Sequence, residues 1–263
     1  MKRMESDLGQ RSPRGHGNGH GNTAAAGNGN GNGNGNGNGD PPIVFKSKVV
    51  VMQRIQDLVR REYHHWTSGI IPAAKIGRLV KKFDSKYGIS ASKAERQRRK
   101  RYGVRTGWLI IWQPETDGLA MWWLVVDERH VANQVEMTRF AGDKDARIKI
   151  PAAYAIGSKD GISDYELVRL DGRWTWRMTK KRYDAWRDRI RQAVLEPESD
   201  RRAMLCRQAG YSLHRAPGFR GIRSDVYELI RYFRARWRRA RRGKTSPPVS
   251  LQLPSKVRRL NHG

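Results

Sequence analysis

The chain contains a single cysteine, Cys206, among its 263 residues. One thiol cannot form a disulfide within the chain, and it cannot supply the several thiolates of a structural zinc site. The chain also lacks an apolar run of the roughly 18 residues that a membrane-spanning helix requires. Its first ten residues contain no apolar core of a secretion signal. These absences predict a cytoplasmic protein, nucleoid-associated if the source is bacterial, with no membrane partner.

Acidic residues are scarce. Asp and Glu number 25 against 53 Lys and Arg, so the formal net charge is +28. A protein of this charge repels itself unless a polyanion neutralises it, and phosphate contacts gain further from counterion release. Nine tryptophans indicate a packed core and exclude a wholly disordered basic chain. The composition therefore predicts a folded protein whose partner is nucleic acid, either DNA or RNA.

The chain divides into three segments by composition. Residues 1–42 begin with basic residues and continue into an unbroken Gly-Asn alternation, which cannot bury apolar surface and predicts a disordered tail. Residues 43–244 show helical patterns, then strand patterns, then helical patterns, which predict a single α+β nucleic-acid-binding domain. Residues 245–263 contain three prolines and several basic residues, and we expect an extended basic C-terminal tail.

The element boundaries follow from periodicity and capping residues. Apolar spacings of three and four predict a helix over residues 48–66, and Pro72 and Gly88 are expected to open and end a second one. Central strands are predicted over Trp108–Trp112, Leu119–Val126, residues 165–170 and Arg173–Met178, and the two-residue Asp171-Gly172 link is typical of a β-hairpin. Three C-terminal helices are expected: one capped by Thr179, one over residues 200–209 stopped by Gly210, and one capped by Ser224. Antiparallel hairpins would thus lie between two helical regions.

The helix predicted over Lys93–Arg101 carries six basic residues and almost no apolar face. Ser92 and Glu95 form a capping-box pattern at its start. We predict that this helix lies against phosphates through Arg96, Arg99 and Lys100, although a solvated face is the alternative. Together with the preceding helix it resembles a helix-turn-helix, whose second helix enters the major groove. Asp84 and Gln97 depart from that pattern, where a small and an apolar residue are usual.

The last predicted helix has an apolar stripe on one face and seven arginines on the other. Like charges so close together repel, and phosphate would relieve this repulsion. Arginine also makes bidentate contacts with phosphate and stacks on bases. We predict nucleic-acid contacts at Arg231, Arg234, Arg238, Arg241 and Arg242. The alternatives for this face are a merely solvated surface or an acidic protein partner, which would make the chain an assembly protein.

The strand tryptophans could form a stacking platform for bases or fill the core. The core is favoured for most of them. Trp122 and Trp123 are adjacent on one strand and should point to opposite faces of the sheet.

Two acidic residues flank the strand Leu119–Val126. Pro114-Glu115 precedes it and Asp127-Glu128-Arg129 follows it, an arrangement that resembles the PD-(D/E)XK nuclease pattern. In that family two carboxylates hold Mg²⁺ and a lysine aids the attacking water. Here Glu115 replaces Asp, and Arg129 replaces a lysine and stays protonated. The resemblance implies Glu115 and Asp127 as catalytic residues; apart from it, no catalytic residue, metal or cofactor is predicted.

Tyr63-His64-His65 resembles the tyrosine and histidine pair of DNA-nicking enzymes, in which two histidines spaced His-x-His on a strand hold a metal and the tyrosine attacks the phosphate, but here the histidines are adjacent. The predicted helix over residues 48–66 would separate the two histidines by about 100° and prevent chelation of one ion. The leading prediction is therefore a protein that grips the phosphate backbone with two basic helices, in a plasmid, phage or mobile-element DNA-handling system or a ribonucleoprotein. A metal-dependent nuclease or RNA-processing endonuclease is the second possibility.

Overall fold

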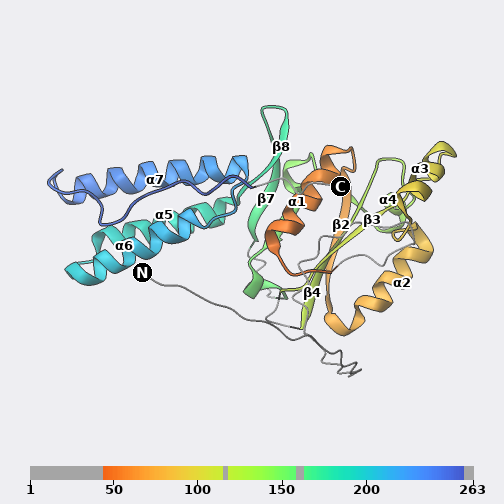
Figure 1. The fold of residues 1–263 in the computed structure, drawn as a ribbon, viewed down its shortest axis with the longest axis horizontal. Coiled ribbons are helices and arrows are strands. Elements are labelled where there is room, and N and C mark those ends of the chain that lie inside the picture. Colours follow the sequence, from red (N-terminus) through yellow and green to blue (C-terminus); the bar gives the residue numbers. More distant parts are fainter. Residues whose placement is uncertain (1–43, 115–117, 158–162, 258–263) are drawn as a thin grey trace, which may run out of the picture. The chain divides into compact units, whose positions relative to one another are not determined.

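Two β-sheets flanked by helices make up the computed structural model, which describes residues 44–114, 118–157 and 163–257 (Figure 1). The predicted α+β class is confirmed. The N-terminal segment 1–42 and Glu115 lie outside the described residues, so the predictions made for them stay predictions.

The first sheet has five strands in the order β1-β3-β4-β2-β5. The first pair, β1 and β3, is parallel, and the other neighbours are antiparallel. The sequence predicted β3 and β4 with these bounds, but it did not predict the other three. In chain order the strands are β1 (Val44–Phe45), β2 (His65–Pro72), β3 (Trp108–Trp112), β4 (Leu119–Val126) and β5 (Arg139–Phe140).

The helix predicted over residues 48–66 is shorter than expected. Helix α1 spans Lys48–Arg60, and Glu62 then takes a positive φ of 72°, which turns the chain towards β2. Gly69 of β2 lies opposite Trp122, and a Cβ at this glycine would lie 2.8 Å from the Trp122 ring. Pro72 ends β2 and does not open a helix; the 3₁₀ turn η1 (Ala73–Lys75) precedes α2 (Ile76–Tyr87).

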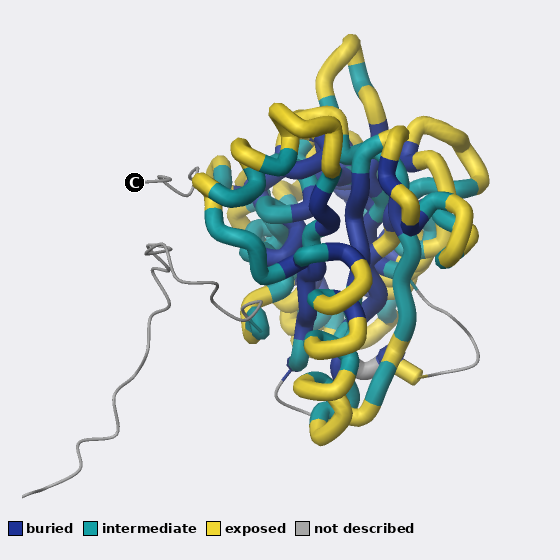
Figure 2. The backbone as a smooth tube through the Cα atoms, turned by 90° about the vertical axis from the view of Figure 1, so that its right-hand side faces the viewer, coloured by how far each residue is buried: buried dark blue, intermediate teal, exposed yellow. Residues whose placement is uncertain are grey.

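The two faces of the first sheet pack into separate hydrophobic clusters, as the alternation of Trp122 and Trp123 predicted. Trp123 is fully buried in the main core, which α1 and the second sheet also line. Trp122 lies on the opposite face, where its ring is 5.2 Å from that of Phe83 in α2. Figure 2 shows buried backbone at the centre, with exposed loops and helical turns around it.

The second sheet consists of β6 (Lys149–Pro151), β7 (Ser163–Leu170) and β8 (Arg173–Met178), all antiparallel. Asp171 and Gly172 both have positive φ at the turn between β7 and β8, which confirms the predicted hairpin. The Trp176 indole donates to the carbonyl of Met52 at 2.8 Å and so joins this sheet to α1. Three short elements connect strands: α4 (Ala132–Val135) lies between β4 and β5, η2 (Lys144–Ala146) between β5 and β6, and η3 (Ala153–Ala155) between β6 and β7.

Helices α5 (Lys180–Leu195), α6 (Ser199–His214) and α7 (Arg220–Ala240) follow the second sheet (Figure 1). Thr179 caps α5 as predicted. Gly210 does not stop α6; a Cβ there would lie 2.6 Å from Val249, so the glycine makes room for the later chain. Helix α7 begins at Arg220 and not after Ser224, because Gly221 lets its first turn approach the Trp176 carbonyl.

The chain after α7 returns along the helices. The Trp237 indole donates to the Thr245 carbonyl at 3.1 Å, and the Val257 amide donates to the Gly218 carbonyl at 3.3 Å. Residues 245–257 therefore contact the helices, and they form no helix or strand. Within the described ranges, every helix is too short or too polar to cross a bilayer.

Candidate nucleic-acid interface

Helix α7 separates its apolar and basic residues onto two faces. The predicted apolar stripe is buried. Arg231, Arg234 and Arg238 are exposed, and their spacing of three and four places them along one side of the helix. Because the stripe docks the helix, these three guanidinium groups face solvent.

Helix α5 completes a shallow groove beside this row of arginines. Arg187 of α5 is exposed, and its guanidinium lies 4.8 Å from the ring centre of Tyr232 in α7. No local pattern singled out Arg187, since α5 has mixed charge and only its packing against α7 brings this residue to the site. We call this the α5–α7 groove; it is lined by Tyr183, Arg187, Glu228, Arg231, Tyr232, Arg234, Ala235 and Arg238.

The α5–α7 groove is strongly basic. Four arginines and one glutamate line it, which leaves an excess of three positive charges. Glu228 lies 3.4 Å from Arg231, but both side chains are at least half exposed, and exposed ion pairs contribute less than about 1 kcal/mol. Burial raises the pKa of Tyr183, so its hydroxyl is a hydrogen-bond donor at pH 7. The groove therefore presents many hydrogen-bond donors to a ligand, and Glu228 is its one negatively charged acceptor among the lining residues.

The two remaining arginines predicted on this helix lie beyond its end at Ala240. Arg241 is half-buried, donates to the Val194 carbonyl at 3.3 Å and lies 5.2 Å from the centre of the Trp237 ring. Arg242 is exposed in the following turn. Neither residue lines the α5–α7 groove.

Helix α3 (Lys93–Arg101) begins as predicted, with the Ser92 hydroxyl accepting the Glu95 amide. Arg96 turns inward. Its guanidinium donates to the Ala91 carbonyl at 2.8 Å, to the Gly107 carbonyl at 2.9 Å and to the Ile89 carbonyl, and it lies 3.8 Å from the centre of the Trp108 ring. Burial lowers the pKa of Arg96 to about 10, so the group is protonated at pH 7.

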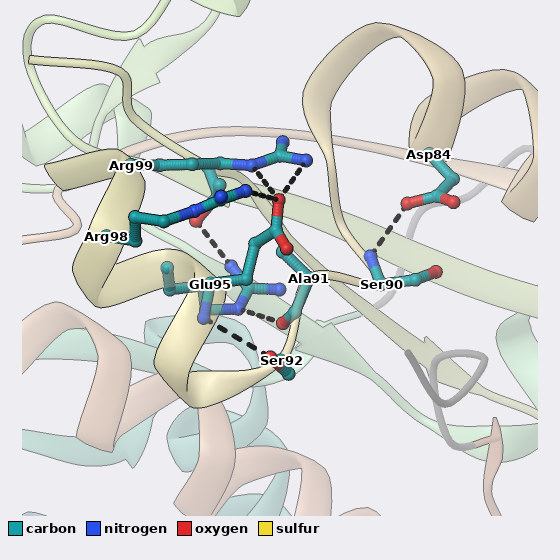
Figure 3. Close-up of polar contacts among 9 residues, drawn as sticks. Asp84, Ser90, Ala91, Ser92, Glu95, Arg98 and Arg99 are labelled. Atoms are coloured by element: carbon teal, nitrogen blue, oxygen red, sulfur yellow. Dashed lines mark hydrogen bonds and ion pairs between the residues drawn. The ribbon is translucent and has the colours of Figure 1, made fainter. Parts of the chain in front are cut away.

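The other two candidates on α3, Arg99 and Lys100, do not share the inward position of Arg96. Figure 3 shows Arg98 and Arg99 both directed at the carboxylate of Glu95, at 3.5 and 2.7 Å. The charge and hydrogen bond of Arg99 lower the pKa of Glu95. Lys100 is exposed. The structure thus does not gather Arg96, Arg99 and Lys100 on one exposed face, and their contact with phosphate stays a prediction.

The helix-turn-helix resemblance also stays a prediction. Asp84, which departs from that pattern, accepts the Ser90 amide at 2.8 Å and so fixes the turn between α2 and α3 (Figure 3).

The candidate catalytic residues are only partly described. Asp127 lies 3.4 Å from Arg105 and accepts the Arg129 amide at 3.1 Å, whereas Glu115 is outside the described ranges. His64 precedes β2 and His65 begins it, so the expectation that both lie on a helix was wrong. In the described part of the chain, no three His, Cys, Asp or Glu side chains are placed to hold a metal ion. The nuclease interpretation stays a prediction.

Comparisons of this chain with protein-family models, curated proteins and solved structures found no match. The helices and strands themselves define the class, an α+β protein with an arginine-lined groove. Its function has to be argued from the charge, exposure and contacts of the residues described above.

Proposed function

We propose that this protein binds nucleic acid by gripping the phosphate backbone in the α5–α7 groove. The observation that carries the proposal is the convergence of Arg187, Arg231, Arg234 and Arg238, from two helices, on a groove with one carboxylate. Arginine presents a planar fork of donors that matches two phosphate oxygens. A polyanion would also relieve the mutual repulsion of the four guanidinium groups.

The groove suits a phosphate backbone better than a small anion. Three of its arginines follow one another along α7, so successive phosphates of one strand can be contacted in turn. The hydroxyls of Tyr183 and Tyr232 can donate to the same backbone without adding charge. Contacts of this kind hold a strand without reading its sequence, so we expect affinity that depends strongly on salt and weakly on sequence.

The test measures binding of labelled single-stranded and double-stranded DNA and RNA of equal length by fluorescence anisotropy over a series of salt concentrations. Replacing Arg231, Arg234 and Arg238 together by Gln should lower affinity by at least about tenfold at ~0.1 M salt and reduce the slope of log K against log salt by about 2 to 3. Gln keeps the helix propensity while removing the charge.

The matched control replaces Arg78, Lys81 and Lys86, which are exposed on α2, by Gln. It removes the same charge from another surface and should leave most of the affinity in place. Equal losses in both triple variants would show that only net charge matters and would overturn the proposed groove. Absence of binding to every oligonucleotide would overturn the function itself and favour an acidic protein partner. Shortened products on a gel would favour the nuclease.

A further inference from the structure

A second basic groove lies between the end of α1, the β7–β8 hairpin and the first residue of α7. It is separate from the α5–α7 groove and shares no lining residue with it. Glu62 is the one carboxylate that lines it among the described residues. We call it the hairpin groove; its basic side chains are Arg60, Arg169, Arg173 and Arg220, all exposed.

The hairpin groove holds aromatic rings that contact one another and are partly open to solvent. Trp174 of β8 and His64 have ring centres 5.8 Å apart with planes inclined by 39°. Phe140 of β5 continues the row, 5.8 Å from His64 and 5.5 Å from His65. The two inner rings, Trp174 and His64, are half-buried, and Phe140 is 39% exposed. These rings lie at the border of the core and keep part of their surface exposed.

Two further features suit a nucleobase. Burial lowers the pKa of His64, so its ring is neutral at pH 7 and can stack as an uncharged aromatic. Gln56 lines the same groove and donates to the Trp174 carbonyl at 3.1 Å, which leaves its buried Oε1 atom without a partner among the described residues. An N–H group on the edge of a base, such as N3–H of thymine, could satisfy this acceptor.

Helix α7 connects the two grooves. Each residue of an α-helix advances by about 100° around its axis. Arg231 is 11 residues after Arg220, so it lies within about 20° of the same side of the helix. Arg238 is 18 residues after Arg220, which is about five whole turns. Arg220 therefore leaves α7 on the same side as Arg231 and Arg238, and its guanidinium contacts the exposed carboxylate of Asp171 in the β7–β8 turn. The path from Arg220 to Arg231 is about 16 Å along the helix, a distance that a few nucleotides of one strand can cover.

We propose that the hairpin groove holds an unpaired nucleotide of the bound strand, with its base stacked on Trp174 and His64 and its phosphates on the four arginines. The inference rests on the proposed nucleic-acid function and adds to it the type of strand that the protein prefers. In a duplex the faces of the bases are covered by their neighbours, so only an unpaired base can offer its face to a protein ring. The preferred ligand is therefore a single strand, or a duplex with an unpaired end.

The experiment is a double-mutant cycle on the full chain. Wild type and Trp174→Ala are titrated with a homothymidine strand and with a strand of equal length in which every nucleotide is abasic. Stacking predicts that Trp174→Ala lowers affinity for the homothymidine strand by about tenfold and leaves affinity for the abasic strand unchanged. Trp174→Phe should retain most of the affinity. Gln56 binds the main chain of Trp174, so this contact survives the substitution.

The arginine variants separate this inference from the proposed function. Arg169→Gln with Arg173→Gln keeps Trp174 and should weaken both strands equally, and so should the triple variant of α7. Tighter binding of a duplex than of a single strand would overturn the hairpin-groove inference while leaving backbone binding intact. The same conclusion would follow if Trp174→Ala lowered affinity equally for both strands, or if it did not lower affinity at all. If wild type binds neither strand nor any duplex, the proposed function itself fails.

Discussion

Helices α3 and α7 are both rich in arginine, but the structure uses their arginines in different ways. Helix α3 has six basic residues in nine and none of its residues is buried. Helix α7 has seven arginines in 21 residues and buries an apolar stripe. In α7 the stripe docks the helix, so the arginines on the other face stay exposed. In α3 no apolar residue can dock the helix, and Arg96 takes this role by bonding three carbonyls and stacking on Trp108.

The comparison shows that the number of arginines in a helix does not measure how many are available to a ligand. The number of available arginines depends on whether apolar and basic residues lie on separate faces of the helix. A helix that packs against the core through an apolar face can leave its arginines in solvent. Each helix nevertheless has one charged residue that turns inward and bonds main-chain groups outside the helix. For α3 this residue is Arg96. For α7 it is Asp225, which is 5% exposed and accepts the Met178 amide at 2.7 Å.

The largest effect is expected at Arg96. Arg96→Met removes the hydrogen bonds to Ala91, Gly107 and Ile89 and leaves these carbonyls without their donor, which should lower the free energy of unfolding by about 2 to 4 kcal/mol. Lys100→Met on the same helix and Arg234→Met on α7 should each change it by less than about 0.5 kcal/mol. Urea unfolding followed by circular dichroism measures all three. Equal, small changes would show that Arg96 does not anchor α3.

The second effect concerns Asp225 and depends on pH. Asp225→Ala leaves the Met178 amide unpaired and should cost about 2 kcal/mol, and Asp225→Asn should cost less because it keeps an acceptor. Burial raises the pKa of Asp225 despite the opposing effects of the Met178 amide and Arg177. The folded state therefore holds this proton more tightly than the unfolded chain does. The stability that this adds is fully present below the unfolded pKa of about 4 and is lost as pH rises through the folded pKa.

The pH series makes this contrast measurable. The stability gap between wild type and Asp225→Asn should be fully developed at and below the unfolded pKa and should shrink as the pH rises towards neutrality. The gap between wild type and Arg96→Met should stay constant over that range, since the pKa of Arg96 is about 10. Urea midpoints at several pH values test both statements. A gap for Asp225→Asn that widens with pH would mean that the carboxylate is held ionised.

Local patterns predicted the regular parts of the fold. Aromatic and β-branched runs gave β3, β4, β7 and β8, and Asp171-Gly172 gave the hairpin, because these features depend on neighbours in sequence. The strand β2 was missed because Val59, Tyr63 and Trp66 happen to follow helical spacing. Its conformation depends on the turn at Glu62 and on pairing with β4, and the sequence around it shows neither.

The residues of the candidate site were predictable only where the pattern of a single helix determines which side chains are exposed. The apolar stripe of α7 already implied that Arg231, Arg234 and Arg238 face outward. Arg187 joins them only because α5 packs beside α7, and Arg96 turns inward only because loop carbonyls surround it. Which elements pack together depends on long-range contacts, and no local pattern encodes these.

The smallest effect compares the two helices as binding surfaces through the glutamate on each helix that contacts its arginines. Glu228 contacts Arg231 in the α5–α7 groove, and Glu95 contacts Arg98 and Arg99 on α3. Glu228→Gln removes the one negative charge of the groove and should raise affinity for a single strand about twofold at low salt, in keeping with the few tenths of a kcal/mol of an exposed pair.

Glu95→Gln is the matched substitution. It keeps the Ser92 cap, which uses the main-chain amide of residue 95, and it releases two arginines. If the α5–α7 groove is the main contact, its effect on affinity should be smaller than that of Glu228→Gln. Anisotropy titrations of both variants at one low salt concentration decide the order. A larger gain from Glu95→Gln would reverse the comparison, because it would show that α3 binds the phosphates and that α7 contributes less.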